Sequence, residues 1–232
     1  MTAPDAVLTE IQELQGEQMG RTLDILNRDT LVTGTAVRYA AGVAGRTTCA
    51  TAIAKIDVQS AIRTLEGANA KKLKRMVVAG EKIGTRPIAP AYVALGHTDC
   101  RADYEDLPGW IRVEEYASLK DRLPGEIGSF LNVRFCVSTH GKVWLAGGIA
   151  LGSTGCVAAD STTTDAYATV IFGEHAYATI PMQKLTVKSI IKKLGYKDEL
   201  DMVGSSGWKA AHAVKITNED NMVRIEHLVT DV

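Results

Sequence analysis

The side chains best suited to chemistry gather in one short stretch of the sequence. His97, Asp99, Cys100, Asp103 and Glu105 lie within nine residues, and side chains of these types bind metals or transfer protons in other proteins. Their spacing matches no recognised metal site. On a helix that begins near Asp99, Asp99 and Asp103 share one face, which suits a helix cap followed by a solvated carboxylate. We therefore predict a structural role for this cluster.

The glycine-rich segments lack the spacing of nucleotide-binding or nucleophile motifs. Gly141 and Lys142 are followed by Val143, where a phosphate-binding loop needs Ser or Thr. Segment 147–155 contains no G-x-G-x-x-G, and GSSG at 204–207 is one residue short of G-x-S-x-G. We expect surface loops here. The sequence thus predicts no catalytic, cofactor-binding or metal-binding residue, and no cofactor.

Two histidines near the C-terminus are harder to dismiss. The alternating runs 208–216 and 222–229 flank the polar segment 218–221 and predict a β-hairpin. In that hairpin His212 faces His227 on an otherwise apolar face. Such a pair is most often two neutral, hydrogen-bonded core residues, and less often a pH-sensitive pair or a metal site. Because burial lowers a histidine pKa, we expect stability to fall below about pH 6.

The overall composition excludes several classes of protein. The 232 residues are 46% hydrophobic and 23% charged, with a formal net charge of -1, so the chain is not globally disordered. Its apolar runs are shorter than the ~18 residues of a membrane helix, and we expect no membrane partner and no signal peptide. The balanced charge argues against a protein that neutralises many phosphates. The four widely spaced cysteines predict reduced thiols.

Two helices and a series of short strands are predicted. Segment 6–28 has no proline and carries apolar residues at three- and four-residue steps, which gives a helix of about 36 Å. A compact body of this chain length has a radius of gyration of roughly 17 Å, so this helix is expected to be a spine. The second helix, 56–70, has Asp57 as its expected N-cap. A short helix is expected at 99–107 and strands at 76–79, 90–95, 132–138, 143–146, 166–172, 176–180, 185–191, 208–216 and 222–229.

Taken in order, six pieces of the chain resemble the major capsid protein family of tailed bacteriophages, in particular its podophage-type branch. The resemblance extends over nearly the whole chain. Each piece is weakly specific, and the order and spacing of all six carry the resemblance. The pieces are LTE at 8–10 with GEQMGRTLD at 16–24, DVQSAIRTL at 57–65, AYVALGHTD at 91–99, GEIG at 125–128 with VRF at 133–135, GEHAY at 173–177, and GWKA at 207–210 with VRIEH at 223–227.

The resemblance implies an α+β fold, that of the tailed-phage major capsid proteins, with a long spine helix, an elongated peripheral domain and a compact axial domain. Residues 1–49 and 181–232 would form the peripheral domain, with the spine helix at about 5–29 and the C-terminal β-hairpin, and residues 50–180 the axial domain. Such a protein is not an enzyme. It self-assembles into the icosahedral head that encloses double-stranded DNA, repeating nearly equivalent heterologous contacts between copies.

The same resemblance implies the partners and the location. The expected partner is the chain itself, in the pentamers and hexamers of a shell, together with scaffolding or portal proteins and packaged DNA held by non-specific contact. The location would be the virion, assembled in the cytoplasm of the host bacterium. Capsid proteins of this type normally precede the spine helix with an extended N-terminal arm and a long hairpin loop that reach over neighbouring subunits. This chain begins at the helix cap. The chain is expected to be processed or truncated, to have its start upstream, or to close its shell by other contacts; of these we favour truncation, which would give a monomer or a small ring.

Charge is unevenly placed along the chain. Segment 1–29 carries six acids against Arg21 and Arg28, a sum of -4, and segment 184–197 carries five lysines and no acid, a sum of +5. These segments are expected either to face each other, between subunits or within one, or to be two independent solvated faces.

A function of another class remains open. A small cytosolic binding protein or hydrolase on a mixed sheet could use the loop 147–155 with Ser153, Thr154 and the nearby Cys156. Such a protein should show a pocket lined by convergent polar groups.

Overall fold

A computed structural model describes residues 3–76, 87–116, 122–151, 155–160, 162–181, 188–192 and 204–231. The chain divides into two compact units. The smaller unit comprises Met1–Asn27 and Ala178–Lys215, and the larger unit comprises Arg28–Tyr177 and Ile216–Val232. The boundary between them falls inside the first helix, α1 (Ala3–Val32). No helix in the described ranges combines the length and apolarity that crossing a bilayer requires.

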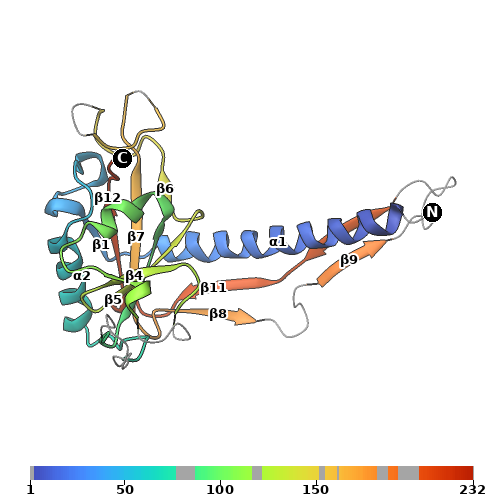
Figure 1. The fold of residues 1–232 in the computed structure, drawn as a ribbon, viewed down its shortest axis with the longest axis horizontal. Helices are drawn as coiled ribbons and strands as arrows, with labels where there is room; N and C mark the ends of the chain where they lie inside the picture. The colour runs from blue at the N-terminus through green and yellow to red at the C-terminus, as the bar shows by residue number, and fades with distance from the viewer. Residues whose placement is uncertain are drawn as a thin grey trace. The chain divides into compact units, whose positions relative to one another are not determined.

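The larger unit is built on an eight-stranded mixed sheet (Figure 1). Its strand order is β1-β12-β7-β2-β5-β4-β3, with β6 paired to β7. The β1–β12 and β2–β5 pairs are parallel, and the others are antiparallel. The strands are β1 (Val37–Tyr39), β2 (Tyr92–His97), β3 (Ile111–Arg112), β4 (Glu126–Phe130), β5 (Val133–Ser138), β6 (Val143–Trp144), β7 (Ala166–Phe172) and β12 (Met222–His227).

Strand β7 lies at the centre of this sheet. All seven of its residues are buried, so the strand is covered on both faces and reads as a continuous run, AYATVIF, without polar alternation. The sequence predicted this strand with the same bounds. The predicted strands at 132–138, 143–146 and 222–229 are also present, shortened by one to two residues at one end or both. Of the predicted strand 76–79, all but Met76 lies outside the described residues.

Helix α2 (Lys55–Gly67) covers part of the sheet through one apolar face. Its buried residues Val58, Ala61, Ile62 and Leu65 repeat at three- and four-residue steps and join the main hydrophobic cluster. The predicted helix 56–70 is confirmed, but its expected cap is wrong. Ala54 is the N-cap, and Asp57 lies one turn inside, where its carboxylate accepts a hydrogen bond of 2.9 Å from the Ala54 amide. Short helical turns complete the unit: η1 (Ala40–Gly42), η2 (Arg46–Thr48), η3 (Thr98–Cys100), α3 (Arg101–Glu105), η4 (Val113–Glu115) and η6 (Glu219–Asn221).

The smaller unit contains most of α1 and two small two-stranded ladders. One ladder pairs β9 (Lys188–Lys192) with β10 (Ser205–Lys209), and the other pairs β8 (Tyr177–Pro181) with β11 (His212–Ile216). The long helix predicted at 6–28 is confirmed as a single helix of 30 residues. Of the side chains that the structure describes in this unit, none is buried. This unit therefore lacks a hydrophobic core of its own in its described part.

The predicted C-terminal hairpin is wrong. The single run 208–216 is two strands, β10 and β11, which pair with different partners. Strand β11 pairs with β8, whereas β12 pairs with β7 on one side and β1 on the other. Because five of its six residues are buried, β12 gains more by entering the central sheet than by folding back on β11. The peripheral and axial assignments of 1–49 with 181–232 and of 50–180 stay predictions.

Candidate functional site

The cluster around His97 is engaged in local contacts. The His97 ring lies between the Thr139 carbonyl, at 3.1 Å from Nε2, and the Asp99 amide, which donates to Nδ1 at 3.2 Å. The Tyr167 hydroxyl donates to Asp99 at 2.9 Å, and the Thr230 amide donates to Asp103 at 3.1 Å. These bonds fit the structural role predicted for the cluster. Across the described ranges, no group of three or more His, Cys, Asp or Glu side chains has metal-site geometry.

The cysteine of that cluster lies deep in the core. Burial raises the pKa of the Cys100 thiol to about 12, which disfavours the nucleophilic thiolate at neutral pH. All four cysteines are buried and none forms a disulfide: Cys49, Cys100, Cys136 and Cys156.

Close packing leaves no space for a side chain at two glycines near these segments. A Cβ at Gly141 would lie 2.6 Å from the His97 Cα, and one at Gly148 would lie 2.3 Å from the Thr164 hydroxyl. Ser153 and Thr154 lie outside the described residues. Cys156, the third residue of the alternative hydrolase hypothesis, is buried, and its backbone forms an isolated antiparallel β-bridge with Thr230.

The two histidines occupy separate environments. The side chain of His212 bonds to Asn27 of α1, with 2.6 Å between Nε2 and the amide oxygen. His227 is fully buried in β12, where Nδ1 donates to the Leu228 carbonyl at 2.8 Å and Nε2 accepts from Thr169 at 2.7 Å. The predicted cross-strand pair is therefore wrong, because the two strands do not pair. The prediction of a buried, hydrogen-bonded core histidine is confirmed for His227 alone.

A buried ion network joins distant parts of the larger unit. The carboxylate of Glu226 is fully buried and accepts hydrogen bonds from Nε and Nη2 of Arg46, at 2.6 and 3.0 Å. Arg224 lies 2.9 Å from the same carboxylate and also donates to the carbonyl of Val32, the last residue of α1. The Arg46 guanidinium stacks 3.6 Å above the centre of the Trp144 ring. The network thus connects β12, β6, the Arg46 segment and the end of α1.

A second buried acid, Glu126, lies on β4, near the other edge of the sheet. Glu126 accepts hydrogen bonds from the Tyr116 hydroxyl at 2.8 Å and from the Leu123 amide at 2.7 Å. The Arg134 side chain, 1% exposed, lies 3.9 Å from the same carboxylate. Sequence analysis missed both networks. In the first, Arg46 and Glu226 are 180 positions apart, and in the second the partners are close in sequence but follow no recognised motif. Their arrangement stabilises the fold and leaves no charged group poised to act on a substrate.

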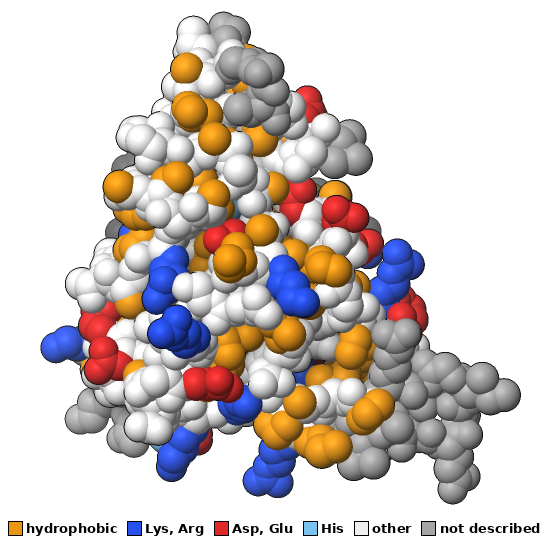
Figure 2. Space-filling view, turned by 90° about the vertical axis from the view of Figure 1, so that its left-hand side faces the viewer, with side chains coloured by type: hydrophobic (Ala, Val, Ile, Leu, Met, Phe, Trp, Pro, Cys, Tyr) orange, Lys and Arg blue, Asp and Glu red, His pale blue; other side chains and the backbone are white. Residues whose placement is uncertain are grey.

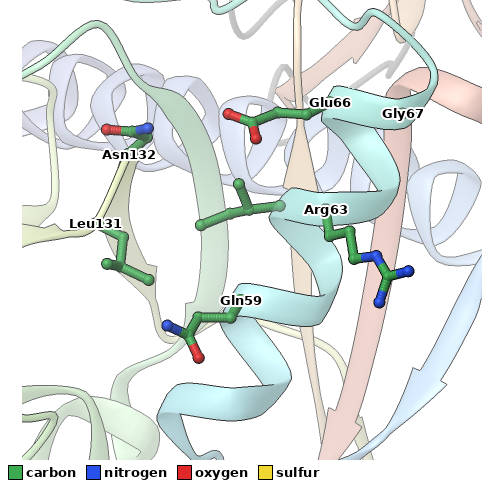
Figure 3. Close-up of a pocket in the computed structure, with 7 residues that line it drawn as sticks. Gln59, Arg63, Glu66, Gly67, Leu131 and Asn132 are labelled. Atoms are coloured by element: carbon green, nitrogen blue, oxygen red, sulfur yellow. The ribbon is translucent and has the colours of Figure 1, made fainter.

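The accessible features of the larger unit flank helix α2. Between α2 and the β4–β5 turn lies a hollow of about 530 Å³ (Figure 3). Gln59, Arg63 and Glu66 project from the helix, and Leu131 and Asn132 face them from the turn. A second hollow, of about 440 Å³, lies between the other side of α2 and the β1 segment. It includes Ile56, which is 68% exposed.

The face that carries α2 has the composition of a contact surface. Figure 2 shows hydrophobic side chains spread over this face, with basic and acidic side chains between them. Exposed Ile56 and Leu131 belong to the two hollows. The two hollows are thus lined by apolar and charged side chains together.

Solved structures provide the deciding comparison, because no family model and no curated protein sequence matches this chain. The head structure of Helicobacter pylori bacteriophage KHP40 superposes with a TM-score of 0.58 at 11% identity, covering 96% of this chain and 68% of the other. The capsid of Ralstonia phage GP4 gives 0.54 at 14% identity, covering 84% and 53%. The capsid of cyanophage P-SCSP1u gives 0.51 at 9% identity, covering 94% and 64%.

This chain has the phage capsid fold. The α+β class and the family resemblance expected from the six sequence pieces are thereby confirmed at the level of fold. The chain spans between 53% and 68% of the length of the phage capsid chains compared here. With identities of 9–14%, the likeness lies in the arrangement of elements and not in individual residues.

Proposed function

We propose that this chain is a structural capsid subunit that self-associates into a closed icosahedral shell around double-stranded DNA. The observation that carries the proposal is the similarity in fold to phage head and capsid structures over 84–96% of the chain. The mixed apolar and charged face beside α2 and the absence of a buried core in the described part of the smaller unit support it. Association between copies would cover the face beside α2 and would bury side chains of the smaller unit.

The finer assignments extend this proposal. Residues 1–49 and 181–232 would form the peripheral domain, with α1 as the spine helix of that domain. Residues 50–180 would form the axial domain. The role is structural and not enzymatic. Scaffolding or portal proteins and packaged DNA, held by non-specific contact, would be the further partners. The protein would be assembled in the host cytoplasm and reside in the virion.

Sedimentation velocity on the 232-residue chain tests the proposal directly. The chain is examined over a wide concentration range, with and without a crowding agent, and the fractions are viewed by negative-stain electron microscopy. Pentamers, hexamers or closed particles are the expected result. A chain that remains monomeric throughout and gives no particles contradicts the proposal. That result would favour the alternative function, a small binding protein.

A further inference from the structure

The exposed side of α1 is an acidic stripe, defined by Glu10, Glu13, Glu17 and Asp24. At about 100° of rotation per residue these four fall within an arc of roughly 60°, and all are exposed. The stripe covers 14 residue steps, or about 21 Å of helix. Arg21 lies at its edge, so the net charge of this side is -3.

The stripe points away from the half-buried side of the helix. Ile11, Gln15, Met19 and Thr22, all of intermediate exposure, lie about 180° around the helix axis from the acids. The acids are therefore available for a partner that approaches the uncovered side of α1.

The β9–β10 ladder of the same unit carries a lysine face, defined by Lys188, Lys192 and Lys209. In the observed register Lys188 lies directly opposite Lys209, and Lys192 is four residues along β9 on the same face. All three are exposed. Like charges placed opposite each other destabilise a ladder, and an acidic partner would remove that cost. The face extends about 13 Å between Lys188 and Lys192, which fits within the length of the acidic stripe.

Within the described ranges, no ion pair engages any of the four acids or the three lysines. The remaining lysines of segment 184–197 (Lys184, Lys193 and Lys197) lie outside the described residues.

We propose that the acidic stripe of one copy docks on the lysine face of a second copy, and that this contact is one of the heterologous interfaces of the shell. The inference rests on the proposed function. A second copy satisfies both faces, because each subunit offers one of each sign and the contact can repeat from subunit to subunit. DNA would neutralise the lysines but would leave the acidic stripe without a partner of opposite charge. The lack of buried described side chains in this unit agrees with a surface that is covered only on assembly.

Two charge-reversed variants test the contact. Variant A carries Glu13→Lys and Glu17→Lys, so both of its faces are positive. Variant B carries Lys188→Glu and Lys192→Glu, so both of its faces are negative. Each variant alone is expected to associate about tenfold more weakly than wild type at low salt. An equimolar mixture is expected to recover association, because every A–B contact joins faces of opposite sign.

A matched control separates this contact from a general effect of charge. Glu114→Lys with Asp220→Lys changes the net charge by the same amount as variant A at two exposed positions outside both faces. This control is expected to associate as wild type does. Recovery in the mixture also shows that both variants are folded.

Wild-type association is expected to weaken as salt is raised to about 0.5 M, where exposed charges are screened within a few ångströms.

The outcomes are distinguishable. A mixture that associates no better than A or B alone overturns the inference, as does a control that loses as much as variant A. Wild-type assembly that A and B both retain overturns the inference and leaves the proposed function intact. If B assembles normally but loses binding to a double-stranded DNA fragment, the lysine face serves nucleic acid and the inference is wrong. A wild-type chain that never associates contradicts the proposed function and this inference together.

Discussion

At the scale of single residues, the stability of the larger unit depends on a carboxylate that has no access to water. Glu226 has no exposed surface and is shared by two arginines. Glu226→Gln would leave the Arg46 and Arg224 guanidinium groups without their counter-charge in a buried site. Breaking such a pair from one side costs about 3–5 kcal/mol of unfolding free energy. Urea denaturation followed by circular dichroism measures this loss.

An exposed acid provides the control for Glu226. Glu66 lies 3.6 Å from Lys72 at the surface, with its side chain 51% exposed, so Glu66→Gln should cost less than about 1 kcal/mol. If the two variants unfold at similar urea concentrations, the buried network contributes no more than an ordinary surface pair.

His227 makes the stability of the fold depend on pH. Burial lowers the pKa of His227, an effect only partly offset by its bond to the Leu228 carbonyl and by the more distant Asp103 and Asp57. The Tyr104 hydroxyl lies 2.6 Å from the Thr169 hydroxyl, which in turn donates to Nε2, so the ring is held in its neutral form. Below about pH 6.5 His227 becomes protonated in the unfolded state but stays neutral in the folded state. The free energy of unfolding therefore falls as the pH falls.

Comparison with His227→Gln isolates this effect, because glutamine can still accept from Thr169 and donate to Leu228 without titrating. The free energy of unfolding of wild type should fall more steeply than that of the variant between pH 7 and about pH 5. Parallel curves for the two proteins would assign the acid sensitivity to other groups.

Sequence patterns could suggest a role only where the explanation is local. The structural role predicted for the cluster at 97–105 fits its turn bonds, whereas the deep burial of Cys100 was not part of that prediction. Arg46 as a partner of Glu226 and Thr169 as a partner of His227 could not be predicted, because they come from a turn and a strand far away in the chain. Only the assembled sheet brings these groups together.

At the scale of elements, the contact between β2 and α3 leaves no space for a side chain at Gly96. A Cβ there would lie 2.2 Å from the Tyr104 hydroxyl. Tyr104 cannot easily move aside, because it is fully buried, bonded to Thr169 and packed against Phe135 with ring centres 4.9 Å apart. Gly96→Ala should therefore destabilise the larger unit by about 1–3 kcal/mol through overpacking. Thermal or urea denaturation measures the cost.

A second glycine and a double mutant sharpen this test. Gly45→Ala is the control, since Gly45 is extended and a Cβ there meets nothing within 4 Å. Gly96→Ala should cost less when Tyr104→Phe has already removed the hydroxyl. Equal costs in both backgrounds would show that the strain does not come from that hydroxyl.

The elements also show what sequence patterns can predict. Apolar periodicity located both main helices, and an unbroken apolar run located the central strand, because both patterns are properties of the element itself. Strand pairing is a property of the whole sheet. The runs before and after 218–221 have the alternation of a hairpin, yet β12 enters the sheet between β7 and β1, and β11 pairs with β8. A nearby turn brings two strands close, but the larger burial offered by a central sheet decides their partners.

At the scale of the whole molecule, the two units differ in what holds them together. The larger unit has an eight-stranded sheet and extensive buried clusters, including the fully buried β7. The smaller unit has a long helix and two-stranded ladders, with no buried side chain among its described residues. Helices and two-stranded ladders gain most of their stability from packing, and without it they open at low free-energy cost.

Hydrogen exchange should therefore separate the units before and after assembly. In the unassembled chain, amides of α1 between residues 11 and 27 and of β9 and β10 should exchange far faster than those of β7. On assembly, contact with neighbouring copies should slow exchange in α1, β9 and β10 by about tenfold or more, while β7 changes little. Mass spectrometry of peptides from both states measures the two rates. Protection in α1 that already equals that of β7 in the free chain, or that does not rise on assembly, would show that this unit is stable without a second copy.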